Sequence, residues 1–253
     1  MIVLKKWETF QLKGMSAAWV LPDWPHDKHK VILYCHGGGY TSGNLGYSRP
    51  LASKLTNATG WETLCFEYRL APEHPFPAAV DDARKAWDYP MYLGYGARDV
   101  MVAGDSAGGN LALVLCHQLK QAGRQLPGKL VLMSPWTDMT ASGRSYTQRA
   151  EIDPTITMDY IRAVREVYAD GKDLTSPFLS PLFGDFTGFP PTLIQVGTNE
   201  ILYSDSIRLR ERMLADNVHC QLEVWNDMWH VFQMFPTRKS ALAMESIGKF
   251  LLD

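Results

Sequence analysis

Six short apolar runs recur along the chain, each with the length of a β-strand. Most are nearly continuous in Val, Ile, Leu, Tyr and Cys, which is typical of strands covered on both faces, as in a parallel sheet. The runs span residues 30–36, 62–68, 99–105, 129–135, 191–197 and 220–226. Segments of helical period lie near residues 48–59, 77–88, 106–122, 156–169, 203–216 and 237–252. This alternation predicts an α/β fold with a mostly parallel central sheet flanked by helices.

The remaining segments complete the predicted organisation. Two earlier apolar runs, 2–9 and 15–21, are expected to form an antiparallel pair at the edge of the sheet. With 253 residues, the chain is expected to form a single domain, 1–253. Residues 137–190 contain one clear helix among many Pro, Gly, Ser, Thr and Asp. In an α/β enzyme such a segment lies above the carboxyl ends of the strands. We therefore expect it to contribute cap and pocket-lining elements.

Charge and composition exclude several classes of protein. A net charge of -2 argues against a nucleic-acid-binding surface. The apolar amino-terminal stretch precedes two lysines, the reverse of a secretory signal, and no run approaches the roughly 20 apolar residues of a spanning helix. We therefore expect a cytoplasmic protein with no membrane span. The spacing of the four cysteines does not match a metal site; they are Cys35, Cys65, Cys116 and Cys220. We therefore expect buried, reduced thiols, and neither a metal nor a cofactor.

The stretch "GDSAG", residues 104–108, joins an apolar strand to a helical pattern. It is a G-x-S-x-G motif in the strand–turn–helix setting of a nucleophile elbow. The turn is so tight that side chains two positions before or after the serine would collide with backbone. The helix that follows points its N–H groups at the same place, which favours developing negative charge. Ser106 is therefore predicted to be a nucleophile; the alternative is a helix N-cap in a glycine-rich turn.

A second glycine-rich stretch, "YCHGGGYTSG", directly follows a strand. The G-x-G-x-x-G or Walker lysine pattern of a phosphate cradle does not follow it. Acyl transfer instead needs N–H donors aimed at the developing oxyanion, and HGGG loops of lipases and esterases supply them. The predicted donors are the amides of Gly38, Gly39 and Ala107. Gly37 is expected to shape the loop, and His36 to hold it by hydrogen bonds.

Four stretches together point to a known family. They are "HGGGY" at 36–40, "YRLAPEHPFPAAVDDA" at 68–83, "GDSAGGN" at 104–110 and "MWHVFQMF" at 228–235. With them the sequence resembles the hormone-sensitive-lipase-like carboxylesterases of the α/β-hydrolase superfamily, from about residue 30 to the C-terminus. The combination is highly specific, although no single motif is.

The resemblance implies the α/β-hydrolase fold and a role for particular residues. It implies Ser106 as nucleophile and His230 as base, with the second and third loop glycines and Ala107 as oxyanion donors. The stretch at 68–83 has no catalytic group in the family and is expected to position the loop and the following helix. Asp81 and Asp82 within it are expected to cap or brace that helix.

One departure from the family concerns the cap. In family members the HGGG loop lies much further from the N-terminus, after helices that cap the acyl and alcohol pockets. Here only the two-strand edge precedes His36. We expect a reduced cap and a more open mouth, covered mainly by residues 137–190; a truncated chain is the alternative, and both stay open.

The base must follow the serine and the acid, because this superfamily has the chain order serine, acid, histidine. His117 lies in the middle of the helix after Ser106, too far along it to reach back. His219 precedes the last strand, at the wrong end of the sheet. His230 follows that strand by a short loop, at the end where the nucleophile emerges.

The acid is expected just after the carboxyl end of the strand at 191–197. Three candidates follow it, Asn199, Glu200 and Asp205. Many family members have a D-P-L-type motif here, and its leucine matches Leu202, so Glu200 occupies the place of the acid. Asp205 is expected to stabilise the amino terminus of the next helix. Asp227 lies too close to His230 on the same loop to be favoured.

The predicted function is a serine carboxylester hydrolase acting on small, short-acyl esters through a Ser-His-Glu triad and a covalent acyl-enzyme. Tyr40 and residues 137–190 are expected to line the pocket. The predicted partner is a small-molecule ester, without nucleic acid. Two alternatives stay open: amide or N-acyl hydrolysis on the same triad, and a non-catalytic binding homologue. The retained His230 argues against the second.

Overall fold

A computed structural model describes residues 6–26 and 28–253 of the chain. Its strands form one eight-stranded sheet in the order β1-β2-β4-β3-β5-β6-β7-β8. Strands β3 to β8 run parallel, and β2 pairs antiparallel with both β1 and β4. The bounds are β1 (Lys6–Leu12), β2 (Met15–Leu21), β3 (Val31–Cys35), β4 (Glu62–Phe66), β5 (Val100–Asp105), β6 (Leu130–Met133), β7 (Thr192–Gly197) and β8 (Cys220–Trp225). The six predicted strands and the antiparallel edge are thus confirmed.

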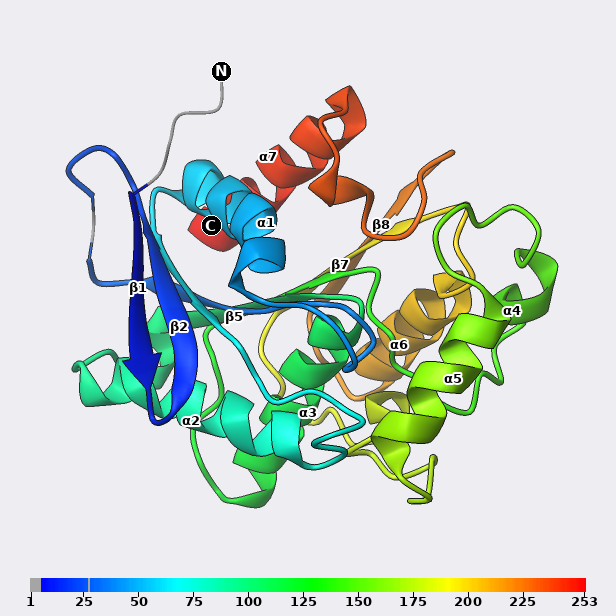
Figure 1. Cartoon of the computed structure of the whole chain (residues 1–253). Helices are drawn as coiled ribbons and strands as arrows, with labels where there is room; N and C mark the ends of the chain where they lie inside the picture. The colour runs from blue at the N-terminus through cyan, green and yellow to red at the C-terminus, as the bar shows by residue number, and fades with distance from the viewer. Residues whose placement is uncertain (1–5, 27) are drawn as a thin grey trace.

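Helices cover both faces of this sheet, α1 and α7 on one and α2 and α3 on the other (Figure 1). The bounds are α1 (Leu45–Thr59), α2 (Ala78–Tyr92), α3 (Ala107–Gln121), α4 (Ser145–Gln148), α5 (Met158–Ala169), α6 (Tyr203–Ala215) and α7 (Arg238–Leu252). All six predicted helices are present. The short α4 was not predicted, since four residues are too few to display a helical period. Over the part of the chain described, no helix is both long and apolar enough to cross a membrane.

The core consists of two layers separated by the sheet. In β3, Val31 and Leu33 pack with residues of α2 and α3, while Ile32 and Tyr34 pack with residues of α1 and α7. Successive side chains of a strand point to opposite faces, so a strand covered on both sides needs an uninterrupted apolar run. All five residues of β3 are buried accordingly.

The edge hairpin departs from the prediction at its turn. The expected strand 2–9 extends instead to Leu12, and a two-residue turn of Lys13 and Gly14 leads into β2. Both turn residues have positive φ, 46° and 87°, which is what a tight two-residue hairpin requires. The predicted five-residue connection was therefore wrong. Residues 2–5 of the expected strand lie outside the described residues.

The four cysteines are all buried and unpaired, as predicted. Burial raises the pKa of the Cys220 thiol to about 12, and it raises the pKa values of the other three thiols as well. These thiols are poor nucleophiles, because the reactive thiolate is disfavoured.

Candidate active site

The nucleophile elbow lies between β5 and α3. Ser106 adopts φ 53° and ψ -120°, a conformation that is strained for any residue other than glycine. A Cβ on Gly104 would lie 2.3 Å from the carbonyl oxygen of Gly108, and one on Gly108 would lie 2.0 Å from that of Cys35. The motif therefore needs both glycines, as predicted. In the described chain the Ser106 side chain makes no capping bond to α3, which argues against the N-cap alternative.

Glu200 and His230 come together at the ends of neighbouring strands. The Nδ1 atom of His230 lies 2.9 Å from Oε2 of Glu200. Oε1 of Glu200 accepts a hydrogen bond from the amide of Gly197 at 2.6 Å and another from the hydroxyl of Ser134 at 2.9 Å. Glu200 is fully buried and His230 is 8% exposed. The carboxylate is thus held by donors on both oxygens, with one oxygen aimed at the imidazole.

The loop after β7, which carries Glu200, and the loop after β8, which carries His230, are hydrogen-bonded directly to each other. The amide of Asn199 donates to the carbonyl of Met228 at 2.8 Å, and the amide of Asp227 donates to Oγ1 of Thr198 at 2.8 Å. A Cβ on Gly197 would lie 2.2 Å from the carbonyl oxygen of Met228. Glycine at the end of β7 therefore allows the two loops to approach closely.

The glycine loop after β3 presents unpaired amide groups. Gly38 and Gly39 both have positive φ, 108° and 62°. The carbonyl of Gly38 accepts from the amides of Thr41 and Ser42 at 3.1 and 3.0 Å, so it points into its own loop. Within residues 6–26 and 28–253, the amides of Gly38, Gly39 and Ala107 donate to no protein acceptor. Free donors on this loop and at the start of α3 suit an oxyanion.

Asp105 holds the glycine loop, a role that sequence analysis missed. Its buried carboxylate accepts hydrogen bonds from the amide of Gly37 at 2.9 Å, from the hydroxyl of Tyr47 at 2.7 Å and from the hydroxyl of Tyr34. Burial raises the pKa of Asp105, and the hydrogen bonds from the two tyrosines, followed by electrostatic interactions with His36 and His230, oppose that rise. Its position beside the nucleophile, at the end of β5, was the only signal in the sequence.

His36 supports the same loop, in agreement with the prediction. Its Nδ1 atom lies 2.7 Å from the carbonyl oxygen of Gly37, and its ring stacks on Tyr68 at a centroid distance of 4.1 Å. Burial lowers the pKa of His36. The neighbouring Arg69 bonds to Asp82 of α2 at 2.8 Å, which confirms the bracing role expected of Asp82.

Tyr40 does not line an open pocket, contrary to the prediction. The side chain is fully buried, and its hydroxyl donates to Oδ1 of Asn110 at 2.7 Å. Its ring stacks on Tyr168 of α5 at a centroid distance of 3.7 Å. Tyr40 therefore links the glycine loop to α3 and α5 through buried contacts.

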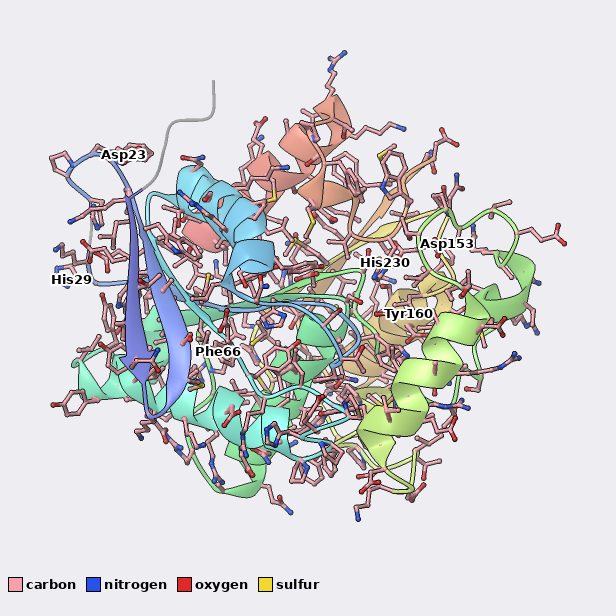
Figure 2. The ribbon with its side chains drawn as sticks, viewed as in Figure 1. Asp23, His29, Phe66, Asp153, Tyr160 and His230 are labelled. Carbon is pink, nitrogen blue, oxygen red and sulfur yellow. The ribbon has the colours of Figure 1, made fainter. Side chains whose placement is uncertain are left out.

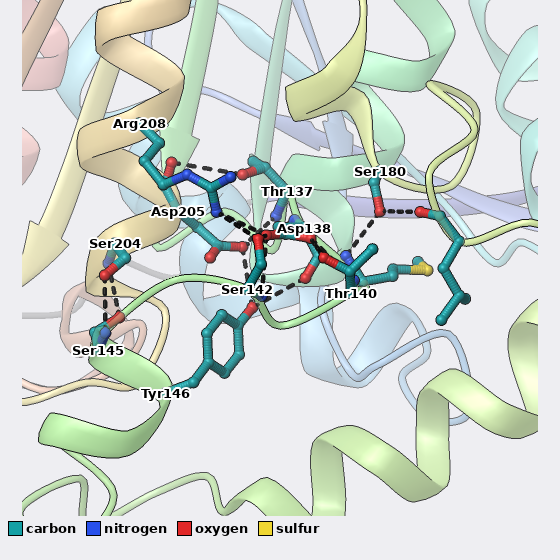
Figure 3. Close-up of polar contacts among 12 residues, drawn as sticks. Thr137, Asp138, Thr140, Ser142, Ser145, Tyr146, Ser180, Ser204, Asp205 and Arg208 are labelled. Atoms are coloured by element: carbon teal, nitrogen blue, oxygen red, sulfur yellow. Dashed lines mark hydrogen bonds and ion pairs between the residues drawn. The ribbon is translucent and has the colours of Figure 1, made fainter.

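Asp205 lies in a separate polar cluster (Figure 3). Its Oδ2 atom accepts from the amides of Thr137 and Asp138 at 2.8 and 3.0 Å, and from the hydroxyl of Tyr146 at 3.1 Å. Burial, and next the charge of Asp138, raise the pKa of Asp205 to about 8. Asp205 lies in the first turn of α6, as expected, but no side chain of the described residues caps this helix, and the carboxylate binds the segment after β6 instead.

The other histidines and Asp227 are engaged elsewhere. His117 packs in α3 against Phe186 and Phe189, and burial lowers its pKa to about 4. His219 is exposed at the amino end of β8, as expected. The exposed carboxylate of Asp227 lies 3.9 Å from Nζ of Lys239.

Residues 137–190 contact both the glycine loop and the loop of Glu200. A Cβ on Gly39 would lie 2.6 Å from the hydroxyl oxygen of Tyr160, so this side chain of α5 rests against the glycine loop. The carboxylate of Asp153 accepts from the amide of Ile201, next to Glu200, at 2.8 Å. Figure 2 shows Tyr160, Asp153 and His230 on the same side of the molecule.

The chain is similar to known proteins in sequence and in structure. The model of a family described as the alpha/beta hydrolase fold matches residues 32–234. An acetyl-hydrolase of Streptomyces hygroscopicus is 37% identical over 238 residues, which cover 93% of this chain and 79% of the relative. An esterase of Acinetobacter venetianus is 36% identical over 219 residues, covering 85% and 72%.

Solved structures extend the likeness to the whole fold. An esterase from the bacterial hormone-sensitive lipase family superimposes with a TM-score of 0.94 at 38% identity, covering 98% of this chain and 84% of that one. The esterase EstE5, in a crystal soaked with p-nitrophenyl butyrate, superimposes with a TM-score of 0.94 at 36% identity over the same shares of both chains.

Proposed function

We propose that this chain, which belongs to the hormone-sensitive-lipase-like carboxylesterases of the α/β-hydrolase fold family, hydrolyses esters through a triad of Ser106, His230 and Glu200. Membership of the family accounts for the reaction class, and the triad is our assignment. The observation that carries it is the 2.9 Å contact between Nδ1 of His230 and Oε2 of the fully buried Glu200. A buried carboxylate in that position favours the tautomer of His230 that leaves Nε2 free to accept a proton.

Acylation begins at the elbow. The Oγ atom of Ser106 attacks the ester carbonyl carbon while its proton passes to Nε2 of His230. The carbonyl oxygen becomes an oxyanion and accepts hydrogen bonds from the amides of Gly38, Gly39 and Ala107. The C–O bond to the alcohol then breaks, and the alcohol leaves with the proton from His230. The acyl group stays on the serine as an ester.

Deacylation repeats these steps with water. His230 removes a proton from a water molecule, whose oxygen attacks the acyl-enzyme carbonyl. The same three amides take up the second oxyanion. The bond to Oγ of Ser106 breaks, the proton returns to Oγ, and the carboxylic acid leaves. Throughout, Glu200 orients His230 and stabilises its cationic form.

We assign residues 1–253 to one α/β-hydrolase domain in which 137–190 supply the cap and line the substrate site. The contacts of Tyr160 with the glycine loop and of Asp153 with the acid loop support this assignment. Tyr160 restricts the room above Gly39, which favours small esters with short acyl chains. The name of the acetyl-hydrolase relative, and the p-nitrophenyl butyrate used with EstE5, support the same substrate class.

Turnover of p-nitrophenyl esters from acetate to dodecanoate, beside the matched butyryl anilide, tests this function. We expect the highest kcat/KM for acetate or butyrate, slow or undetectable anilide cleavage, and loss of turnover in Ser106→Ala. Anilide cleavage as fast as ester cleavage would establish an amidase. A folded protein that turns over none of these substrates would support the binding homologue.

A further inference from the structure

Ser134 lies between the strand that leads to Ser106 and the strand that leads to Glu200. It directly follows β6, which is between β5 and β7 in the sheet. The amide of Ser106 donates to the carbonyl of Met133 at 2.9 Å, and the amide of Ser134 donates to the carbonyl of Gln195 at 2.8 Å. The backbone around Ser134 is thus tied on one side to the strand of the nucleophile and on the other to the strand of the acid.

The backbone at this junction is strained at two residues. Ser134 has φ 49° and Val231, the neighbour of His230, has φ 51°. Left-handed backbone is uncommon for serine and a real outlier for a β-branched residue such as valine. Such conformations persist only where surrounding interactions hold them. Glycine would accept the backbone of residue 134 without strain, so the serine side chain needs a separate explanation.

The hydroxyl of Ser134 connects the acid and base loops. It donates to Oε1 of Glu200 at 2.9 Å and accepts from the amide of Val231 at 3.1 Å. Ser134 is fully buried, so water does not compete for these bonds. Donation to the carboxylate uses the single hydroxyl hydrogen and leaves the lone pairs for Val231. One oxygen atom therefore helps to orient the Glu200 carboxylate, together with the amide of Gly197, and also holds the backbone next to His230.

We propose that Ser134 is a positioning residue for the ester hydrolysis, acting on His230 from both ends through Glu200 and Val231. This inference rests on the triad proposed above. A hydrogen bond to a charged group is stronger than one between neutral groups, and the buried carboxylate of Glu200 needs such donors to remain an oriented acceptor. The backbone bond to Val231 holds the loop so that the imidazole stays within reach of that acceptor.

Two substitutions separate the hydroxyl from the backbone conformation. Ser134→Ala removes the hydroxyl and keeps the strain, whereas Ser134→Gly removes the hydroxyl and relieves the strain. With p-nitrophenyl butyrate we expect both to lower kcat about tenfold to hundredfold, the effect of one hydrogen bond to a charged group, at nearly constant KM. Ser134→Gly should unfold at a higher temperature than Ser134→Ala. A glycine variant with the kcat of the parent overturns the proposal.

Thr192→Val is the matched control. Thr192 is also fully buried, and its hydroxyl donates to the carbonyl of Pro190 at 2.9 Å, but at the amino end of β7. Losing this bond should lower the unfolding temperature and leave kcat in place. If Thr192→Val lowers kcat as much as the Ser134 variants, the effect is one of general stability and the proposal fails.

The double variant Ser134→Ala with Glu200→Gln decides whether Ser134 acts through the acid. Residues that act as a unit are strongly non-additive, so adding Ser134→Ala to Glu200→Gln should lower kcat little further. A full additional loss would show independent action and overturn the proposal. If Glu200→Gln alone keeps the parental kcat, the proposed triad is wrong. If Glu200→Gln is inactive but Ser134→Ala keeps the parental kcat, the triad stands and the proposal for Ser134 fails.

Discussion

The Oε2 atom of Glu200 lies 2.9 Å from Nδ1 of His230, although 30 positions in the chain separate the two residues. The competing carboxylate, Asp205, accepts its hydrogen bonds from Thr137, Asp138 and Tyr146 instead. The two carboxylates are therefore engaged in different networks, one at the imidazole of His230 and one at residues 137–146. This separation allows their roles to be distinguished by substitution.

Glu200→Gln should lower kcat by up to about 10⁴, because the amide no longer stabilises a charged imidazole or enforces its tautomer. Asp205→Asn should retain most of the activity, since the carboxylate of Asp205 binds Thr137, Asp138 and Tyr146 and makes no hydrogen bond to His230 among the described residues. Steady-state kinetics with p-nitrophenyl butyrate measures both. The reverse ranking would show that Asp205 is the acid.

Asp205 should make stability depend on pH. Its pKa of about 8 in the fold exceeds the ordinary value, so the folded protein favours the protonated carboxyl. The resulting stabilisation is complete below about pH 4 and is lost as pH rises through about 8. Between these values the free energy of unfolding should fall with pH by at most about 1.4 kcal/mol per unit.

Denaturant unfolding of the parent and of Asp205→Asn from pH 5 to pH 9 checks this dependence. The parent should lose stability relative to the variant as pH rises, because asparagine has no proton to release. Stability curves that stay parallel over this range would contradict an Asp205 carboxyl that is protonated in the fold.

Asp105→Asn should reduce kcat by about 10² to 10³, the range seen when one oxyanion donor is lost. The carboxylate of Asp105 accepts three bonds, and an amide would direct N–H groups at one or more of the same donors. The brace on Gly37 would weaken, and the amides of the next two glycines would move. Tyr47→Phe, which removes a single donor, should have a milder effect. Unchanged kcat in a folded Asp105→Asn variant would show that the Asp105 carboxylate does not support catalysis.

Tyr160→Ala should shift acyl preference toward longer chains by removing the side chain that rests against Gly39. We expect kcat/KM to fall for acetate and to rise for octanoate, measured with p-nitrophenyl esters. Arg162→Ala, exposed on the same helix, is the control and should keep the parental profile. An unaltered profile in Tyr160→Ala would contradict a role of α5 in the substrate site.

Local patterns predicted most of the framework, because period and turn chemistry depend on neighbouring residues. The strands, the helices and the glycines of the elbow are of this kind. Contacts between distant residues were predicted only where the family's motifs indicate them, as for Glu200 and His230. Others were not predicted: Ser134 meets Glu200 across 66 positions, and Gly37 meets Asp105 across 68. The expectation for Asp205 was incomplete for the same reason. Asp205 was interpreted by its place in a helix, whereas its partners lie in a segment 67 and 68 positions away.

The mass of the intact protein after reaction with a p-nitrophenyl alkylphosphonate tests the central claim most directly. Ser106 in a working triad should take up one phosphonyl group, found on the peptide that contains it. Ser106→Ala should take up none, and Glu200→Gln should react far more slowly than the parent. A folded parent that stays unlabelled, or a label on another residue, would contradict the proposed triad.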